Sequence, residues 1–131
     1  MASILRAGVV GAGVFGSPHA AQSARRAEVE LAAIFDPHPE RAQALAGRFG
    51  AAACADLASL LPRFDVVSIA APAHAHAALA LAALAAGKPI YVEKPIAICL
   101  EGADAIAEAA ARTGLAVACG FLERSLFEAI G

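Results

Sequence analysis

Short apolar runs alternate with longer segments of mixed polarity along the whole of this 131-residue chain. Near-continuous apolar runs are typical of strands that are covered on both faces, as in a parallel sheet. The pattern predicts six strands, at residues 4–10, 29–35, 51–54, 64–70, 89–92 and 115–120.

The segments between these strands carry helix start and stop signals, which are capping side chains, prolines and glycines. The predicted helices span residues 37–49, 56–61, 75–86 and 100–112, and another follows the first strand as far as about residue 26. Asp56 is expected to cap the second of these, which Pro62 ends. Gly50, Gly87 and Gly114 are expected to end the other three. Pro18 leaves two alternatives for the helix after the first strand, a late start with Ser17 as its cap or a kinked start.

Strands that alternate with helices indicate an α/β fold, a doubly wound, mostly parallel six-stranded sheet with right-handed crossovers. The expected strand order is 3-2-1-4-5-6, that of a Rossmann domain. We expect residues 1–122 to form this single domain. Residues 125–128 match a helix capping box, so residues 123–131 are expected to start the passage to a second α+β domain that this chain lacks.

Composition narrows the partners that the domain could have. The chain is 60% hydrophobic and 17% charged, with a formal net charge of -2. It therefore lacks the excess of basic residues that is typical of proteins that bind nucleic acid or acidic lipid. The longest weakly polar run, residues 69–86, contains Pro72, His74 and His76 and is mostly alanine, so we do not expect it to cross a membrane. The N-terminus does not resemble a signal peptide, and a cytoplasmic location is expected.

The three cysteines, Cys54, Cys99 and Cys119, are odd in number and not closely spaced. They form neither a disulfide framework nor a CxxC metal site, and no metal is expected. We expect them to be small buried side chains.

The motif Gly11-Ala12-Gly13-Val14-Phe15-Gly16 closes the first strand, and Asp36 ends the second. This strand, glycine turn, helix and later acidic residue make up a dinucleotide fingerprint. The first glycine makes the tight turn, the second lets the backbone approach the pyrophosphate, and the third lets the helix pack on the sheet. A carboxylate at Asp36 would bind the ribose hydroxyls and repel a 2'-phosphate, which favours NAD over NADP. Arg41, one helical turn later, leaves tolerance of NADP open.

Further motifs extend this fingerprint over most of the chain. They are His19 after the glycine turn, Asp36-Pro37, Ala71-Pro72-Ala73-His74-Ala75-His76, Glu93-Lys94-Pro95-Ile96-Ala97 and Gly120-Phe121-Leu122-Glu123-Arg124. In this order and at this spacing, they resemble the glucose-fructose oxidoreductase, inositol dehydrogenase and MocA family of NAD(P)-dependent sugar oxidoreductases.

The resemblance implies roles for single residues. Cofactor-binding roles fall on Gly11, Gly13, Val14, Phe15, Gly16, Asp36, Pro37, Ala71, Pro72, His76, Glu93 and Lys94. Lys94 would accept the proton of the substrate hydroxyl, and the alternative is an exposed lysine in a turn. His76 is a weaker catalytic candidate and could equally be a local hydrogen-bonding group. His74 is expected in a solvated loop and Tyr91 in the core.

The function implied is hydride transfer between a nicotinamide and a hydroxyl or carbonyl of a small sugar or cyclitol. Hydride transfer needs a substrate that is walled against the nicotinamide, so the chain as given is expected to bind the dinucleotide better than it catalyses. A stand-alone dinucleotide-binding or sensing module and a self-associating structural domain are the alternatives. A homo-oligomer formed through the surface left by the missing domain is expected.

Overall fold

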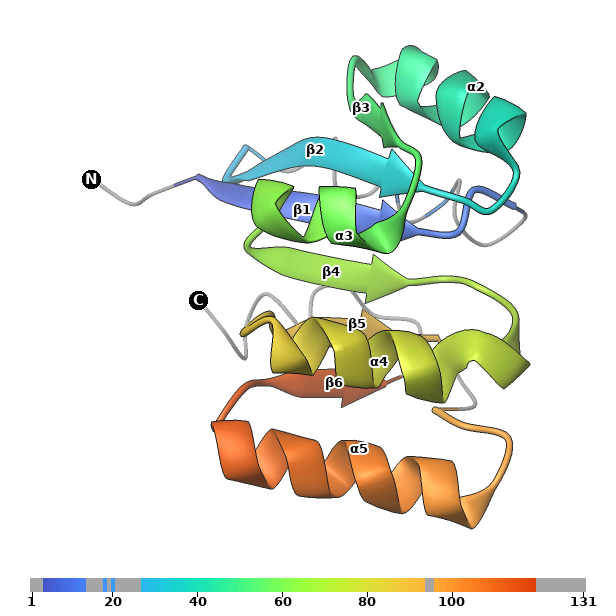
Figure 1. Cartoon of the computed structure of the whole chain (residues 1–131). Coiled ribbons are helices and arrows are strands. Elements are labelled where there is room, and N and C mark those ends of the chain that lie inside the picture. The colour runs from blue at the N-terminus through green and yellow to red at the C-terminus, as the bar shows by residue number, and fades with distance from the viewer. Residues whose placement is uncertain (1–3, 14–17, 19, 21–26, 94–95, 120–131) are drawn as a thin grey trace.

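A parallel six-stranded sheet organises the chain. The computed structural model describes residues 4–13, 18, 20, 27–93 and 96–119. The strands are β1 (Leu5–Val10), β2 (Val29–Phe35), β3 (Ala52–Cys54), β4 (Val66–Ile69), β5 (Ile90–Val92) and β6 (Val117–Cys119). Their order is β3-β2-β1-β4-β5-β6 and every pair is parallel, so the predicted fold is confirmed. All the strands point the same way in Figure 1, so their carboxyl ends meet at one edge.

The helices lie between these strands as predicted. They are α2 (Pro39–Phe49), α3 (Leu57–Leu60), α4 (His76–Ala85) and α5 (Leu100–Thr113), with 3-10 turns η1 (Leu61–Arg63) before β4 and η2 (Ala73–Ala75) before α4. Of these helices, α2 and α4 start later than predicted. The Asp56 side chain accepts a 2.7 Å hydrogen bond from the Ser59 nitrogen, which confirms the predicted cap. α3 ends at Leu60, one residue before the predicted end at Leu61, and Pro62 lies within the 3-10 turn η1 that follows.

Two glycines end helices as expected. Gly50 follows α2 and Gly114 follows α5, each in the left-handed conformation that glycine adopts most cheaply. Of the helix predicted after β1, the structure describes only Pro18 and Ala20, and both are helical. Ser17 and the rest of that helix lie outside the described residues, so the choice between a late and a kinked start stays a prediction.

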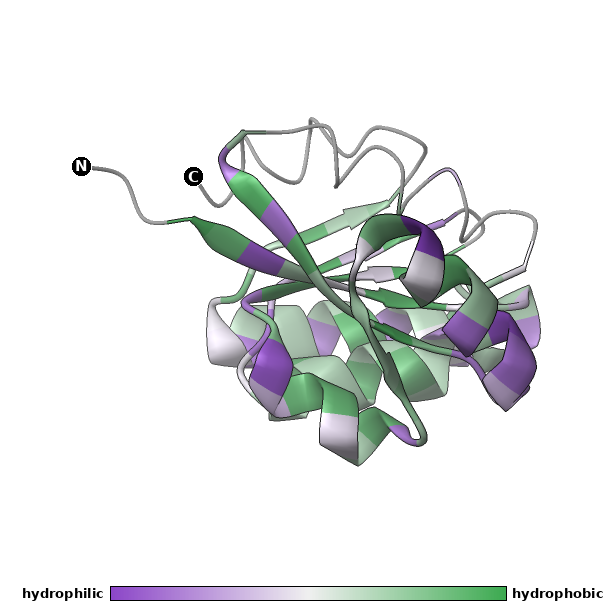
Figure 2. Ribbon diagram, turned by 90° about the horizontal axis from the view of Figure 1, so that it is seen from above, coloured by the Kyte–Doolittle hydropathy of each residue, from purple (hydrophilic) through white to green (hydrophobic). Residues whose placement is uncertain are grey.

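Both faces of the sheet are covered. Phe64, Leu84 and Ile106 belong to one core cluster with residues of β4 and β5. The helices α3, α4 and α5 therefore lie on one face of the sheet (Figure 1). On the other face, Leu45 of α2 packs with Val9 and Ile34. The strands are mostly green in Figure 2, and purple segments gather on the helices and loops, as burial of both faces requires. Tyr91 is 1% exposed, as expected of a core residue.

The expectation for the cysteines is wrong in two of three cases. Cys54 is buried, but Cys99 and Cys119 are exposed. Cys99 is the N-cap residue of α5, and Cys119 ends β6 at the edge of the sheet. No helix in the described part of the chain is long and apolar enough to cross a membrane.

Candidate functional site

The turn after β1 is held tightly between the ends of two neighbouring strands. The Gly11 nitrogen donates a 2.7 Å hydrogen bond to the Phe35 carbonyl oxygen, and the Ala70 nitrogen donates one of 2.8 Å to the Val10 oxygen. Gly11 has a φ of 108°, and a Cβ built there would lie 2.8 Å from the carbonyl carbon and oxygen of Ala70. The fold itself therefore requires glycine at this position.

Gly13 differs from Gly11 in having space for a side chain. Its φ lies outside the left-handed range, and a Cβ built there would meet no atom of the described residues within 4 Å, its chain neighbours aside. Nothing in the described fold excludes a side chain here. A ligand that approaches the backbone would exclude one.

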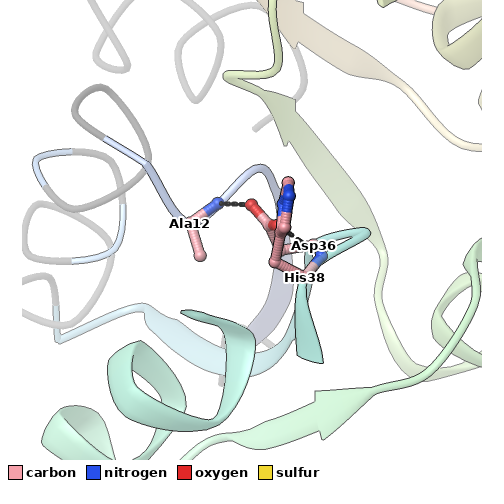
Figure 3. Close-up of polar contacts among 3 residues, drawn as sticks. All are labelled: Ala12, Asp36 and His38. Carbon is pink, nitrogen blue, oxygen red and sulfur yellow. Dashed lines mark hydrogen bonds and ion pairs between the residues drawn. The ribbon is translucent and has the colours of Figure 1, made fainter. Parts of the chain in front are cut away.

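Asp36, at the end of β2, is buried and accepts hydrogen bonds from Ala12 and His38 (Figure 3). Its Oδ2 accepts a 2.8 Å hydrogen bond from the Ala12 nitrogen. Its Oδ1 accepts one of 2.8 Å from the His38 nitrogen and another of 3.1 Å from His38 Nδ1. Burial acts to raise the pKa of Asp36, but these hydrogen bonds outweigh it and hold the pKa below its ordinary value. The carboxylate is therefore ionised and ready to accept further hydrogen bonds.

The same contacts explain why α2 starts two residues later than predicted. The hydrogen bond from the His38 nitrogen to the Asp36 carboxylate closes a turn. Asp side chains often form such turns with the backbone two residues on. Residues 37 and 38 belong to that turn, and α2 begins at Pro39.

The connection from β4 to α4 is closed by a buried histidine. His76 is 2% exposed, and its Nε2 donates a 2.7 Å hydrogen bond to the Ala71 carbonyl oxygen. Because a carbonyl can only accept, this nitrogen carries the hydrogen. The Ala75 nitrogen also donates to the Pro72 oxygen, at 2.9 Å. We call residues 71–76 the β4–α4 corner; its backbone is fixed from within.

These parts surround one cavity of about 340 Å³ at the carboxyl edge of the sheet. Its volume lies within the range of ligand pockets, about 300 to 1,000 Å³. It is lined by Gly11, Gly13, Asp36, Arg41, Ala70, Ala71, Pro72, Ala73, His76 and Glu93. β1 and β4 are neighbours, although β2 and β3 lie between them in the chain, so the cavity sits where the strand order reverses. Ligands of doubly wound sheets bind at this point.

The cavity brings together most of the predicted site residues that the structure describes. Those that line it are Gly11, Gly13, Asp36, Ala71, Pro72, His76 and Glu93. Pro37 is exposed and does not line it, and His74 is exposed in η2. Val14, Phe15, Gly16 and Lys94 lie outside the described residues.

Sequence reasoning missed the contribution of His38. An Asp-X-His order could have suggested the backbone turn, but no sequence signal places the ring on the carboxylate. The structure also adds Ala70 and Ala73 to the cavity lining. Among the residues described, no group of three or more His, Cys, Asp or Glu side chains could hold a metal ion.

A doubly wound sheet, a glycine turn at its switch point and a buried carboxylate at the end of the second strand together define a dinucleotide-binding Rossmann domain. Comparison with protein families gives a more specific result. The model of the Gfo/Idh/MocA group, described as an oxidoreductase family with an NAD-binding Rossmann fold, matches residues 5–121. The chain belongs to this family and has its NAD-binding domain.

Individual relatives show how far the similarity extends. The chain is 37% identical to UDP-N-acetylglucosamine 3-dehydrogenase of Acidithiobacillus ferrooxidans and 38% identical to inositol 2-dehydrogenase of Acidothermus cellulolyticus. In each case 92% of this chain is matched, against 38% and 37% of the relative. The chain thus spans less than two fifths of the length of these relatives.

A solved structure agrees with the sequence relatives. GenD2 from gentamicin A biosynthesis, in complex with NAD, superposes with a TM-score of 0.87 at 33% identity. The match covers 92% of this chain and 35% of GenD2.

Proposed function

We propose that the chain holds NAD in the cavity at the carboxyl edge of the sheet. The adenosine ribose would lie on Asp36, the pyrophosphate over the glycine turn, and the nicotinamide half toward the β4–α4 corner. The family match supports the cofactor, and the position of the cavity at the switch point supports the placement.

The open space at Gly13 is the observation that carries this proposal. A domain that kept its glycine turn for packing alone would need glycine only where the fold excludes a side chain, and that is so at Gly11. At Gly13 the described fold has room for a Cβ, yet the residue lines the cavity and is glycine. Close approach of a pyrophosphate to the backbone accounts for this choice.

Charge and hydrogen bonding at Asp36 favour the ribose of NAD. An ionised carboxylate has about four acceptor positions, and the bonds from Ala12 and His38 occupy three of them. One position, on Oδ2, is left for a ribose hydroxyl. The negative charge would repel a 2'-phosphate, in keeping with a preference for NAD.

We propose further that the domain serves hydride transfer between a nicotinamide and a sugar or cyclitol hydroxyl, as the relatives' names indicate for those proteins. Oxidation of such a hydroxyl sends a hydride from carbon to the nicotinamide, and a base must take the hydroxyl proton. Lys94 is proposed as that base. It directly follows Glu93, which lines the cavity beyond the end of β5.

Self-association is also proposed. Ile98 and Leu100 are 66% and 75% exposed at the start of α5, where an apolar surface would favour contact with a partner. Light scattering is expected to show dimers or larger species that dissociate in the Leu100→Glu variant. A monomer at all concentrations would contradict this part of the proposal.

Amide chemical-shift mapping tests the placement of NAD directly. Adding NAD to the ¹⁵N-labelled chain is expected to shift the amide signals of Gly11, Ala12, Gly13 and Ala71 in a saturable way, and to leave those at the C-terminal end of α5 unchanged. No shift at millimolar NAD, or shifts confined to other surfaces, would contradict it.

With myo-inositol added, we expect no steady NADH production from this chain, because the described cavity residues form only the cofactor side of such a site. Turnover abolished by Lys94→Met would overturn that expectation.

A further inference from the structure

The imidazole of His38 contacts the Asp36 carboxylate, which is the group proposed to bind the ribose. We propose that His38 is a specificity-determining residue, whose charge state sets how strongly this site prefers NAD over NADP. The inference rests on the proposed binding of the dinucleotide at Asp36 and adds a second residue, and a dependence on pH, to cofactor selection.

The geometry places the two side chains in direct contact (Figure 3). His38 Nδ1 lies 3.1 Å from Asp36 Oδ1, the oxygen that also accepts the His38 backbone hydrogen. An ionised carboxylate only accepts, so Nδ1 carries a hydrogen and Nε2 is the nitrogen that gains or loses the proton. The His38 side chain is 56% exposed, whereas that of Asp36 is 7% exposed. His38 is not among the residues that line the cavity, but its exposed ring contacts Asp36, which does, so a group bound at Asp36 would lie beside the imidazole.

Charge at this pair decides between the two cofactors. A phosphate monoester carries a charge of about -1.5 to -2 near neutral pH, and Asp36 alone would repel it. An imidazolium in contact with Asp36 offsets the carboxylate charge and presents Nε2 as a donor to phosphate oxygen. A neutral imidazole does neither. Histidine changes between these states within the physiological pH range.

The other charged side chains near Asp36 and His38 include one arginine and two carboxylates. Arg41 lines the same cavity and stays cationic throughout this range, so it favours a phosphate at every pH. Glu40, the neighbour of Arg41 on α2, and Glu93 of the cavity carry carboxylates, whose charge opposes that of a phosphate. His76, which lines the cavity, is on α4 and donates to the Ala71 carbonyl oxygen through Nε2. A variant at position 38 leaves His76 unchanged and therefore isolates the effect of His38.

The side chain of His38 can be replaced without disturbing the start of α2. It makes no capping hydrogen bond to the helix. The contacts that shape the turn come from its backbone, whose nitrogen donates to Asp36 and whose carbonyl oxygen accepts from the Arg41 nitrogen at 3.0 Å. His38→Gln keeps a neutral donor of similar reach, and His38→Arg supplies a permanent charge.

The test measures the ratio of the Kd for NADP to the Kd for NAD by calorimetry, at about pH 6 and about pH 8. The 2'-phosphate titrates near pH 6 itself, so the wild-type ratio is compared with that of His38→Gln at each pH. We expect the wild-type ratio to be about fivefold below the His38→Gln ratio at the lower pH and equal to it at the higher pH. His38→Arg is expected to lower the ratio at both.

The controls separate this inference from the proposed function. Arg41→Gln is expected to raise the ratio by a similar factor at both pH values, because its charge does not change. If all forms bind NAD but wild type and His38→Gln keep equal ratios at both pH values, the inference is overturned and the proposed function stands. If no form binds NAD, the proposed function is wrong and the inference falls with it.

Discussion

The Ala12 nitrogen donates a 2.8 Å hydrogen bond to Oδ2 of Asp36, although the two residues are 24 positions apart in the chain. This bond joins the glycine turn after β1 to the end of β2. It therefore fixes the positions of these two parts of the proposed cofactor site relative to each other. It also helps to keep the carboxylate ionised.

Asp36→Asn should weaken NAD binding by about tenfold to a hundredfold, the usual cost of losing a hydrogen bond to a charged group. The variant should also lose about 1 to 3 kcal/mol of stability, since the amide cannot satisfy the donors of both Ala12 and His38. Calorimetry and urea denaturation measure the two effects. Asp56→Ala is the control: it removes a helix cap away from the cavity lining and should cost about 1 kcal/mol with NAD affinity unchanged. Equal NAD affinity in the two variants would contradict this role of Asp36.

The stability contributed by Asp36 should depend on pH. Its pKa in the folded chain lies below the ordinary value of 3.8, so its contribution is present above that value and is lost as the pH falls through the folded pKa. The difference in unfolding free energy between wild type and Asp36→Asn should therefore shrink below about pH 4. Urea denaturation between about pH 7 and pH 3 measures it. A difference that stays constant or grows on acidification would show that the carboxylate is not stabilised in the fold.

Gly11→Ala should destabilise the fold itself. The new Cβ would adopt a positive φ and would press on the Ala70 backbone, at a cost of about 1 to 3 kcal/mol for the conformation and more for the contact. Gly50→Ala is the matched control, because Gly50 also has a positive φ but open space around it among the described residues. Chemical denaturation should show the larger loss in Gly11→Ala. Equal losses would mean that the approach of β4 does not constrain the turn.

His76→Leu should leave the half-buried Ala71 carbonyl oxygen without the donor at Nε2 and cost about 1 kcal/mol. His76→Gln should recover part of this, since an amide can donate to the same oxygen. Thermal denaturation compares the three forms. If leucine is tolerated as well as histidine, the hydrogen bond does not hold the β4–α4 corner.

The sequence was sufficient for the sheet because apolar runs and glycine turns are local features. The bounds of β2 were predicted to the residue, and the strand order followed from alternation of strands and helices with the glycine motif. The start of α2 was missed because it depends on one side chain, Asp36, which accepts a hydrogen bond from the His38 backbone nitrogen.

Contacts that depend on rotamers or on position in the sheet could not be predicted in this way. The ring of His38 reaches Asp36 only through its particular side-chain orientation. Cys54 and Cys119 each end an edge strand, but only Cys54 is buried, a difference that a general preference for buried cysteine does not capture.

Binding of NAD against the backbone of Gly13 is the central claim, and titration calorimetry of Gly13→Ala tests it most directly. Gly47→Ala on α2 is the control, because Gly47 also has open space among the described residues but does not line the cavity. Both variants should be as stable as wild type to within about 1 kcal/mol. We expect Gly47→Ala to bind NAD as wild type does and Gly13→Ala to bind it at least about tenfold more weakly, the equivalent of about 1.4 kcal/mol. Equal affinity for NAD in wild type, Gly13→Ala and Gly47→Ala would contradict the claim.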